Sequence, residues 1–416
     1  MRAAWTLVHR YCGLLTAAFL FVSGVTGAVI SWDHELDDLL NPHLMEARTP
    51  GTPQDALALA RQVEARHPDV RVTYVPLHAE AGKSLALGVS PRIDPATHAL
   101  TEPGFNQVFV DPVSGAELGR REWGAVWPIT RETFVSFLYK LHYSLHIPAL
   151  WGTDRWGIWL MGAIALVWTF DCFVGFYLTL PVRRAKTAPP GGKSWWQRWR
   201  PAWNVRWRGG FPKLNFDLHR AFSLWTWIVL LVLAFTAFSL NLYREVFYPV
   251  MQTFTRVTPT PFDTRTPVAP PQAIEPRVPY ADVVARAGAE ARGRGWDVPV
   301  GSLYYSPEFG IYMVSLFAPG DDHGTGGVGP ALLYYDGGDG RLLGERRPWQ
   351  GTAADIFVQA QFPLHSGRIL GLPGRILISC MGLVVAMLSV TGVIIWWRKR
   401  ASRAVATQRQ AALRGA

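Results

Sequence analysis

The sequence predicts an α-helical membrane protein with four transmembrane helices in a bundle and two α+β modules outside the membrane, internally duplicated. Three observations lead to this fold class: four long apolar runs, an uneven distribution of charge between them, and motifs that recur in both halves of the chain. Hydrophobic residues make up 49% of the 416 residues and charged residues only 17%, unlike the composition of an ordinary soluble protein.

The four apolar runs cover residues 12–32, 156–180, 222–243 and 376–397. Each is near the length needed to cross about 30 Å of hydrocarbon, and four crossings place both termini on the same side. Residues 181–217 hold nine basic and one acidic side chain, and residues 398–416 hold six basic and none acidic. Residues 31–155 instead hold eleven basic and sixteen acidic side chains.

By the positive-inside rule, this asymmetry predicts a four-pass protein of the bacterial inner membrane with cytoplasmic termini and two large periplasmic loops. The net charge of +10 is concentrated on the cytoplasmic faces. The bilayer is therefore the expected partner of the basic segments, and nucleic acid is not.

These observations divide the chain into eight segments. The predicted spans lie within 1–32, 142–180 (with an outer-face helix), 219–243 and 365–400, the periplasmic modules are 33–141 and 244–364, and a basic Trp-rich cytoplasmic loop (181–218) and a cytoplasmic tail (401–416) complete the chain.

Motifs at the ends of the spans indicate the duplication. A His-Arg pair opens the first and third spans, and a Leu-His pair precedes the second and fourth; the positions are His9-Arg10, His219-Arg220, Leu141-His142 and Leu364-His365. Residues 111–119 also match residues 336–344 in an Asp-x-x-x-Gly-x-x-Leu-Gly pattern at an offset of 225.

Each outer module is predicted to contain one helix followed by strands. Helical spacing of apolar residues favours helices over 54–66 and 280–292. The predicted strands are 70–75, 84–89 and 107–110 in the first module, and 301–305, 311–317 and 331–335 in the second. The proline-rich segment 259–279 is predicted to be an extended tether that needs no fixed structure.

Four histidines follow the duplication and provide candidate ligands at two levels of the membrane. His9 and His219 open spans at the cytoplasmic side, and His142 and His365 lie near the outer ends of the other two spans. A neutral imidazole is a strong axial ligand for haem iron, and two imidazoles on facing helices can hold one haem. Zinc would favour three or four ligands at one point, so two b-type haems suit two separated pairs better.

Four further residues belong to the candidate sites. His146 lies four residues after His142 on the same helical face and could replace it as ligand, but only His142 has a counterpart in the other half. His146 would then bind a propionate or nothing, and Arg10 and Arg220 are expected to pair with haem propionates. Asp171 is the one carboxylate deep in an apolar run, where it could orient a ligand, relay a proton or be protonated and hydrogen-bonded.

A glycine pattern at residues 324–329 matches a nucleotide fingerprint, but it neither follows a predicted strand nor opens a helix. The electron donor is therefore expected to be separate, either a membrane quinol or a cytoplasmic reductase.

Taken together, these motifs resemble the PepSY-associated transmembrane family over residues 7–400, whose members include inner-membrane reductases associated with uptake of iron-siderophore complexes. The resemblance implies PepSY-like outer modules and a haem-dependent oxidoreductase, with His9 and His219 on the inner haem and His142 and His365 on the outer haem. Electrons would pass from the cytoplasmic side to a periplasmic ferric siderophore, because reduction to Fe(II) weakens binding by hard oxygen ligands. Two alternatives are a non-catalytic PepSY-like binding or regulatory protein and a subunit of an iron or haem transporter.

Overall fold

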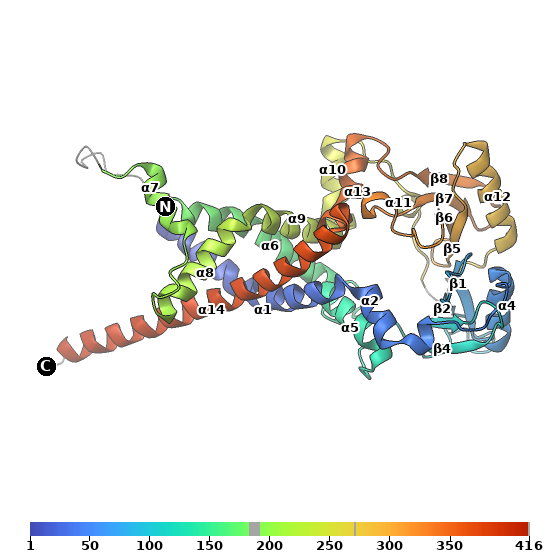
Figure 1. Cartoon of the computed structure of the whole chain (residues 1–416), viewed down its shortest axis with the longest axis horizontal. Helices are drawn as coiled ribbons and strands as arrows, with labels where there is room; N and C mark the ends of the chain where they lie inside the picture. Colours follow the sequence, from blue (N-terminus) through green and yellow to red (C-terminus); the bar gives the residue numbers. More distant parts are fainter. Residues whose placement is uncertain (183–191, 270–271, 415–416) are drawn as a thin grey trace. The chain divides into compact units, whose positions relative to one another are not determined.

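The structure, a computed structural model, describes residues 1–182, 192–269 and 272–414. The predicted loop 181–218, tether 259–279 and tail 401–416 thus each include a few residues outside the described ranges. The chain forms two compact units (Figure 1). The membrane unit comprises Met1–Trp32, Leu138–Val250 and Leu364–Ala416, and the sheet unit comprises Asp33–Phe137 and Met251–Pro363.

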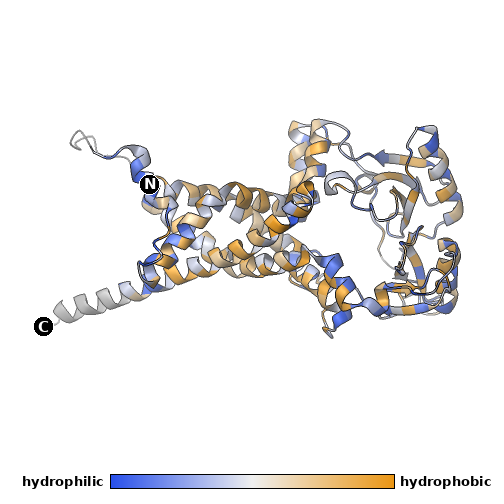
Figure 2. Cartoon of the chain, viewed as in Figure 1, coloured by the Kyte–Doolittle hydropathy of each residue, from blue (hydrophilic) through white to orange (hydrophobic). Residues whose placement is uncertain are grey.

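Three helices of the membrane unit are long and apolar enough to cross a bilayer: α1 (Arg2–Ile30), α6 (Trp156–Thr179) and α14 (Leu372–Arg414). A bent pair, α8 (Phe211–Trp225) and α9 (Trp227–Asn241), brings the number of candidate spans among the described residues to four if it is counted as one. Figure 2 shows apolar residues along these helices, many of them exposed as lipid contact requires.

The third predicted span, over residues 222–243, contains a helix break that its composition does not reveal. The two helices meet at an angle of 74°, and Thr226 between them has φ −107° and ψ 8°. The flanking indoles bond to different segments, because Trp225 donates to the carbonyl of Trp203 and Trp227 donates to that of Cys172. These bonds hold the ends of the two helices in different directions.

Shorter helices lie along the chain between the spans and the strands. They are α2 (Asp33–Leu40), α3 (Pro42–Met45), α5 (Arg131–Ser144), α7 (Trp195–Trp199), the 3₁₀ turn η1 (Arg200–Trp203), the π-turn η2 (Tyr243–Phe247), α10 (Tyr248–Phe254), α11 (Pro261–Thr264), α13 (Ala353–Ser366) and the 3₁₀ turns η4 (Thr325–Gly327) and η5 (Arg368–Leu370).

Glycines allow close helix packing in the membrane unit. A Cβ added at Gly24 of α1 would lie 2.6 Å from the carbonyl oxygen of Gly382 in α14. A Cβ at Gly162 of α6 would lie 2.5 Å from Leu242, just beyond α9. Small residues are favoured at such crossings because lipid supplies no hydrophobic force between helices and close van der Waals packing must do so. α1 therefore packs on α14, and α6 packs on α9.

The sheet unit contains one antiparallel sheet of eight strands in the order β4-β3-β2-β1-β5-β6-β7-β8. The first half of the chain provides α4 (Ala56–Arg66), β1 (Val70–Pro76), β2 (Leu85–Pro91), β3 (Gln107–Val110) and β4 (Glu117–Arg121). The second half provides α12 (Tyr280–Gly293), β5 (Val300–Ser306), β6 (Ile311–Leu316), β7 (Ala331–Asp336) and β8 (Leu342–Arg346). The two predicted modules are thus joined into one sheet by the pairing of β1 with β5.

One helix from each half covers the sheet. Leu59 and Val63 of α4 are buried in one apolar core with strands β1 to β3, and Val283 of α12 is buried in a second core with β5 to β7. Tyr280, at the start of α12, donates to the carbonyl of Val72 in β1. This bond links the helix of one half to a strand of the other.

The proline-rich segment differs from the tether that its composition predicts. It contains α11, and Arg265 forms an ion pair with Asp336 at the end of β7. The backbone N–H groups of Val268 and Ile274 donate to the carbonyls of Glu308 and Pro307. Its described part is therefore held against the second half of the sheet.

The repeated Asp-x-x-x-Gly motif forms the hairpin turns between β3 and β4 and between β7 and β8. Asp111 accepts from the backbone N–H groups of Val113 and Ser114, and Gly115 and Gly340 have φ of +72° and +71°, which favours glycine. Burial raises the pKa of Asp111, but these bonds and one from the hydroxyl of Thr49 outweigh it and lower the pKa to about 2. The motif is therefore a turn-forming element.

Candidate functional site

The first pair of predicted ligands, His9 and His219, meets inside the membrane unit. His9 comes from α1 and His219 from α8, and their ring centres lie 6.2 Å apart with 59° between the ring planes. Each imidazole is held by a different helix, since His9 contacts Asp171 of α6 and His219 contacts α14. Four helices thus converge on this pair.

Hydrogen bonds define which nitrogen of each ring carries the proton. Nδ1 of His9 lies 2.9 Å from both carboxylate oxygens of Asp171, which accept. Nδ1 of His219 lies 3.1 Å from the carbonyl oxygen of Leu388 and 3.0 Å from the hydroxyl of Thr391, which itself donates to the carbonyl of Met387. Nδ1 is therefore the donor in both rings, and Nε2 retains its lone pair.

The second pair, His142 of α5 and His365 of α13, has nearly the same geometry. The ring centres lie 6.1 Å apart, again with 59° between the planes. Nδ1 of His142 donates to the carbonyl of Ser23 at 3.0 Å and lies 3.1 Å from the hydroxyl of Thr26. Nε2 of this ring also keeps its lone pair.

A threonine of α9 fixes His365 in the corresponding way. The hydroxyl of Thr236 donates to the carbonyl of Val232 at 2.7 Å, so its oxygen accepts from Nδ1 of His365 at 2.9 Å. Thr26 likewise donates to the carbonyl of Val22 at 2.7 Å. All four rings are thus held through Nδ1 by partners on other helices.

Glycines lie against three of the four rings. A Cβ at Gly27 would lie 2.9 Å from Cε1 of His142, and Cβ atoms at Gly175 and Gly392 would lie 3.5 and 3.2 Å from Cε1 of His9 and His219. A larger side chain at Gly27 would require the His142 ring to move. The backbone therefore helps to determine the position of that ring.

A cavity of about 410 Å³ opens beside His9 and His219. Its walls are mainly apolar side chains, and the predicted propionate partners Arg10 and Arg220 line it together with Arg2 and Lys399. Arg220 also forms an ion pair with the buried Asp217 at 3.0 Å, whereas Arg10 makes no ion pair among the described residues.

The remaining predicted residues are Asp171 and His146. Asp171 is 9% exposed and bonds to His9, the first of the three roles considered for it. His146 lies beyond the end of α5 with φ +53°, whereas His142 is within the helix and faces His365. The arrangement brings His142 and His365 together.

Sequence reasoning missed Thr26, Thr236 and Thr391. The first two had a detectable signal, because each lies 17 residues after a paired histidine, His9 or His219. Thr391 had none, since its role depends on how α14 faces α8.

Fold and site together define a helical membrane protein in which two pairs of imidazoles from neighbouring helices lie close together. The chain belongs to the family described as PepSY-associated TM region, whose model matches residues 6–399. The search of curated proteins finds no significant match.

Proposed function

We propose that this protein carries electrons across the bacterial inner membrane through two haem b groups, each held by one pair of facing imidazoles. The equal geometry of the two histidine pairs carries the proposal: ring centres lie 6.2 and 6.1 Å apart, with 59° between the planes in both. Two unrelated contacts would not be expected to share both values.

The distance between the ring centres in each pair suits two imidazoles that would hold one ion between them. With metal–nitrogen bonds of about 2.0 Å and ring centres about 1.2 Å behind the nitrogen, two imidazoles that held one ion between them would have centres at most about 6.4 Å apart. The donors also suit haem iron, because hydrogen bonds at Nδ1 leave Nε2 to coordinate. The cavity of about 410 Å³ beside the first pair lies within the size range of ligand pockets.

The two pairs suit electron transfer across the bilayer because they lie at different depths. His9 and Thr26, which contacts His142, are 17 residues apart on the continuous helix α1. At about 1.5 Å per residue this separation is about 26 Å, most of a hydrocarbon layer of about 30 Å. Haem iron would supply reversible one-electron transfer at each level.

The protein's own residues would hold and orient the two groups. The four histidines would ligate iron, Asp171 would orient His9, and Arg10 would pair with a propionate; His146 is assigned no ligand role. The charge distribution supports cytoplasmic termini and periplasmic modules. The electron donor would be a membrane quinol or a cytoplasmic reductase. The matched pairs also support an internal duplication.

The acceptor would be a periplasmic ferric siderophore, as the resemblance of the sequence motifs implies, and the activity that of a ferric-siderophore reductase. One electron converts Fe(III) to Fe(II), and the siderophore's hard oxygen ligands hold Fe(II) less tightly, so iron is released. No bond of the siderophore itself needs to break.

The first test is the haem content of the full chain, purified in mild detergent after expression with adequate haem. We expect two b-type haems per chain and a low-spin bis-histidine spectrum in the reduced-minus-oxidised difference. A colourless protein without haem would refute the electron-carrier function and favour a binding or regulatory protein.

Single substitutions test the assignment of ligands. His9→Ala and His219→Ala should remove the same haem, since one iron needs both rings. His142→Ala should remove the other haem, and His146→Ala should leave both. Loss of different haems from the first two variants, or loss from His146→Ala alone, would contradict the pairing.

A further inference from the structure

A second cluster of potential ligands lies in the sheet unit and has no part in the histidine pairs. His34 in α2 and Asp322 and His323 in the loop between β6 and β7 each offer one ligand atom, and these atoms lie within 4.8 Å of one another. The two imidazole rings are 5.2 Å apart at 72°. All three side chains are exposed, so an ion could reach them directly from solvent.

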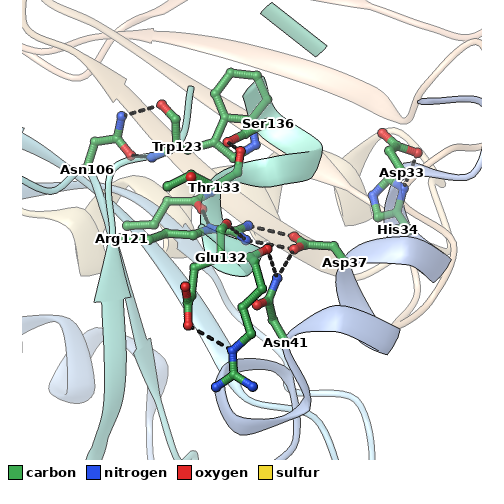
Figure 3. Close-up of polar contacts among 12 residues, drawn as sticks. Asp33, His34, Asp37, Asn41, Asn106, Arg121, Trp123, Glu132, Thr133 and Ser136 are labelled. Atoms are coloured by element: carbon green, nitrogen blue, oxygen red, sulfur yellow. Dashed lines mark hydrogen bonds and ion pairs between the residues drawn. The ribbon is translucent and has the colours of Figure 1, made fainter. Parts of the chain in front are cut away.

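Asp33 orients one of these histidines. Its carboxylate oxygen lies 3.1 Å from Nδ1 of His34, and its side chain is only 19% exposed (Figure 3). Because a carboxylate only accepts, Nδ1 is the donor and Nε2 is left with its lone pair. A carboxylate behind a histidine is the usual outer shell of a protein metal site, where it sets the tautomer and raises the basicity of the ligand.

The helix that carries His34 is fixed to the sheet. Asp37, one turn further along α2, accepts from both terminal nitrogens of Arg121 at 2.8 and 2.7 Å, and Asn41 donates to the same carboxylate at 2.7 Å (Figure 3). Arg121 is 6% exposed and belongs to β4. The backbone of His34 is thus held by a largely buried ion pair.

The loop that carries the other two ligands is the glycine-rich segment that resembles a nucleotide fingerprint. Its glycines Gly324, Gly326 and Gly329 all have positive φ, which allows a tight path. The loop is tied to the sheet unit by the indole of Trp349, which donates to the carbonyl of Thr325 at 2.8 Å. Both sides of the cluster are therefore anchored.

We propose that His34, Asp322 and His323 bind a divalent first-row transition metal ion. Two imidazoles and one carboxylate are the donor set of open zinc sites and of non-haem Fe(II) sites, in which solvent or a second ligand completes the coordination. Resting on the proposed function, the ion would be Fe(II) released by reduction of the siderophore complex. An exposed site with three protein ligands suits temporary binding of such a product.

Zinc is the probe for the site, because the proposed haems contain iron and add nothing to the measured amount of bound zinc. The full chain in detergent, without an affinity tag and treated with chelator, is dialysed against Zn(II) and its bound zinc is measured by mass spectrometry. We expect one site per chain that His34→Ala and His323→Ala each abolish or weaken more than tenfold. The control is His43→Ala, an exposed histidine of the same unit with a single carboxylate partner, which should bind zinc normally.

Asp33→Asn tests the positioning role separately. It should weaken zinc binding about 10- to 100-fold while the number of sites stays at one. Unchanged zinc binding in both His34→Ala and His323→Ala would overturn the site. An anaerobic repeat with Fe(II) should show binding lost in the same variants, and failure of Fe(II) to bind would overturn its assignment as the ion.

Haem spectra of the same samples separate this inference from the proposed function. Normal haem content in His34→Ala together with lost zinc binding supports the site. Zinc binding in a chain that takes up no haem would refute the electron-carrier function while leaving the metal site intact.

Discussion

The carboxylate of Asp171 distinguishes the two histidine pairs electrostatically. Among the four paired histidines, His9 alone donates Nδ1–H to a carboxylate, whereas His219, His142 and His365 donate to carbonyl or hydroxyl oxygens. A negative charge behind an axial ligand favours ferric over ferrous iron. On the proposed function, Asp171→Asn should therefore raise the midpoint potential of the haem that His9 and His219 would hold.

The size of the shift follows from the distance between the charge and the iron. The carboxylate oxygen lies 2.9 Å from Nδ1 of His9, and an iron on Nε2 of the same ring would be about 7 Å from that oxygen. A unit charge at about 7 Å in an effective dielectric constant of about 20 contributes about 2 kcal/mol. For one electron this corresponds to about 100 mV.

The assay is a spectroscopic redox titration of the purified protein, fitted to two one-electron components. His9→Ala, which should lack one haem, identifies the component that belongs to the pair. Asp297→Asn makes the same chemical change at an exposed position of the sheet unit and should shift neither component. Equal shifts of both haems, or no shift in Asp171→Asn, would refute the electrostatic role of this carboxylate.

Two further predictions concern Gly27, which lies against the His142 ring, and Asp111 in the sheet unit. Gly27→Ala should lower occupancy of the proposed His142–His365 haem while the other is kept, because its Cβ would lie 2.9 Å from the His142 ring. Gly293→Ala in α12 of the sheet unit meets nothing within 4 Å and should keep two haems per chain by spectroscopic assay. Asp111→Asn should destabilise the sheet unit by about 1–3 kcal/mol at pH 7. Because the folded-state pKa of Asp111 is lowered to about 2, its contribution to stability is present above about pH 4 and is lost as the pH falls from about 4 to 2. The melting temperatures of the variant and the parent should therefore converge over this pH range. A difference in melting temperature that stays constant with pH would contradict the role of the Asp111 carboxylate.

Sequence patterns located most elements of the sheet unit because buried strands alternate and the two helices have apolar faces. The predicted strands 70–75 and 311–317 correspond to β1 and β6 within about one residue at each end. The edge strands β4 and β8 were missed, since Glu117–Arg121 and Leu342–Arg346 mix charged residues with glycine and lack alternation. Their structure comes from backbone pairing with β3 and β7.

No pattern in the sequence predicts that the two modules join into one sheet. β1 and β5 pair through Tyr74 with Tyr304 and Val75 with Leu303, residues that would suit many other strand pairs. The paired histidines could be predicted because their sequence motifs recur in both halves of the chain, and Thr26 and Thr236 recur at the same spacing from His9 and His219. Thr391 and the ring-contacting glycines depend on helix rotation and crossing, which the apolar composition of a span leaves undetermined.

The chain requires both of its halves to form either histidine pair. His9 and His142 come from the first half and their partners His219 and His365 from the second. The same division appears in the packing of α1 on α14, of α6 on α9 and of β1 on β5. Any group that bridges a histidine pair therefore binds only when the halves are assembled, and by mass action it stabilises that assembly. In this architecture, ligand binding at the paired imidazoles and association of the two halves are a single coupled equilibrium.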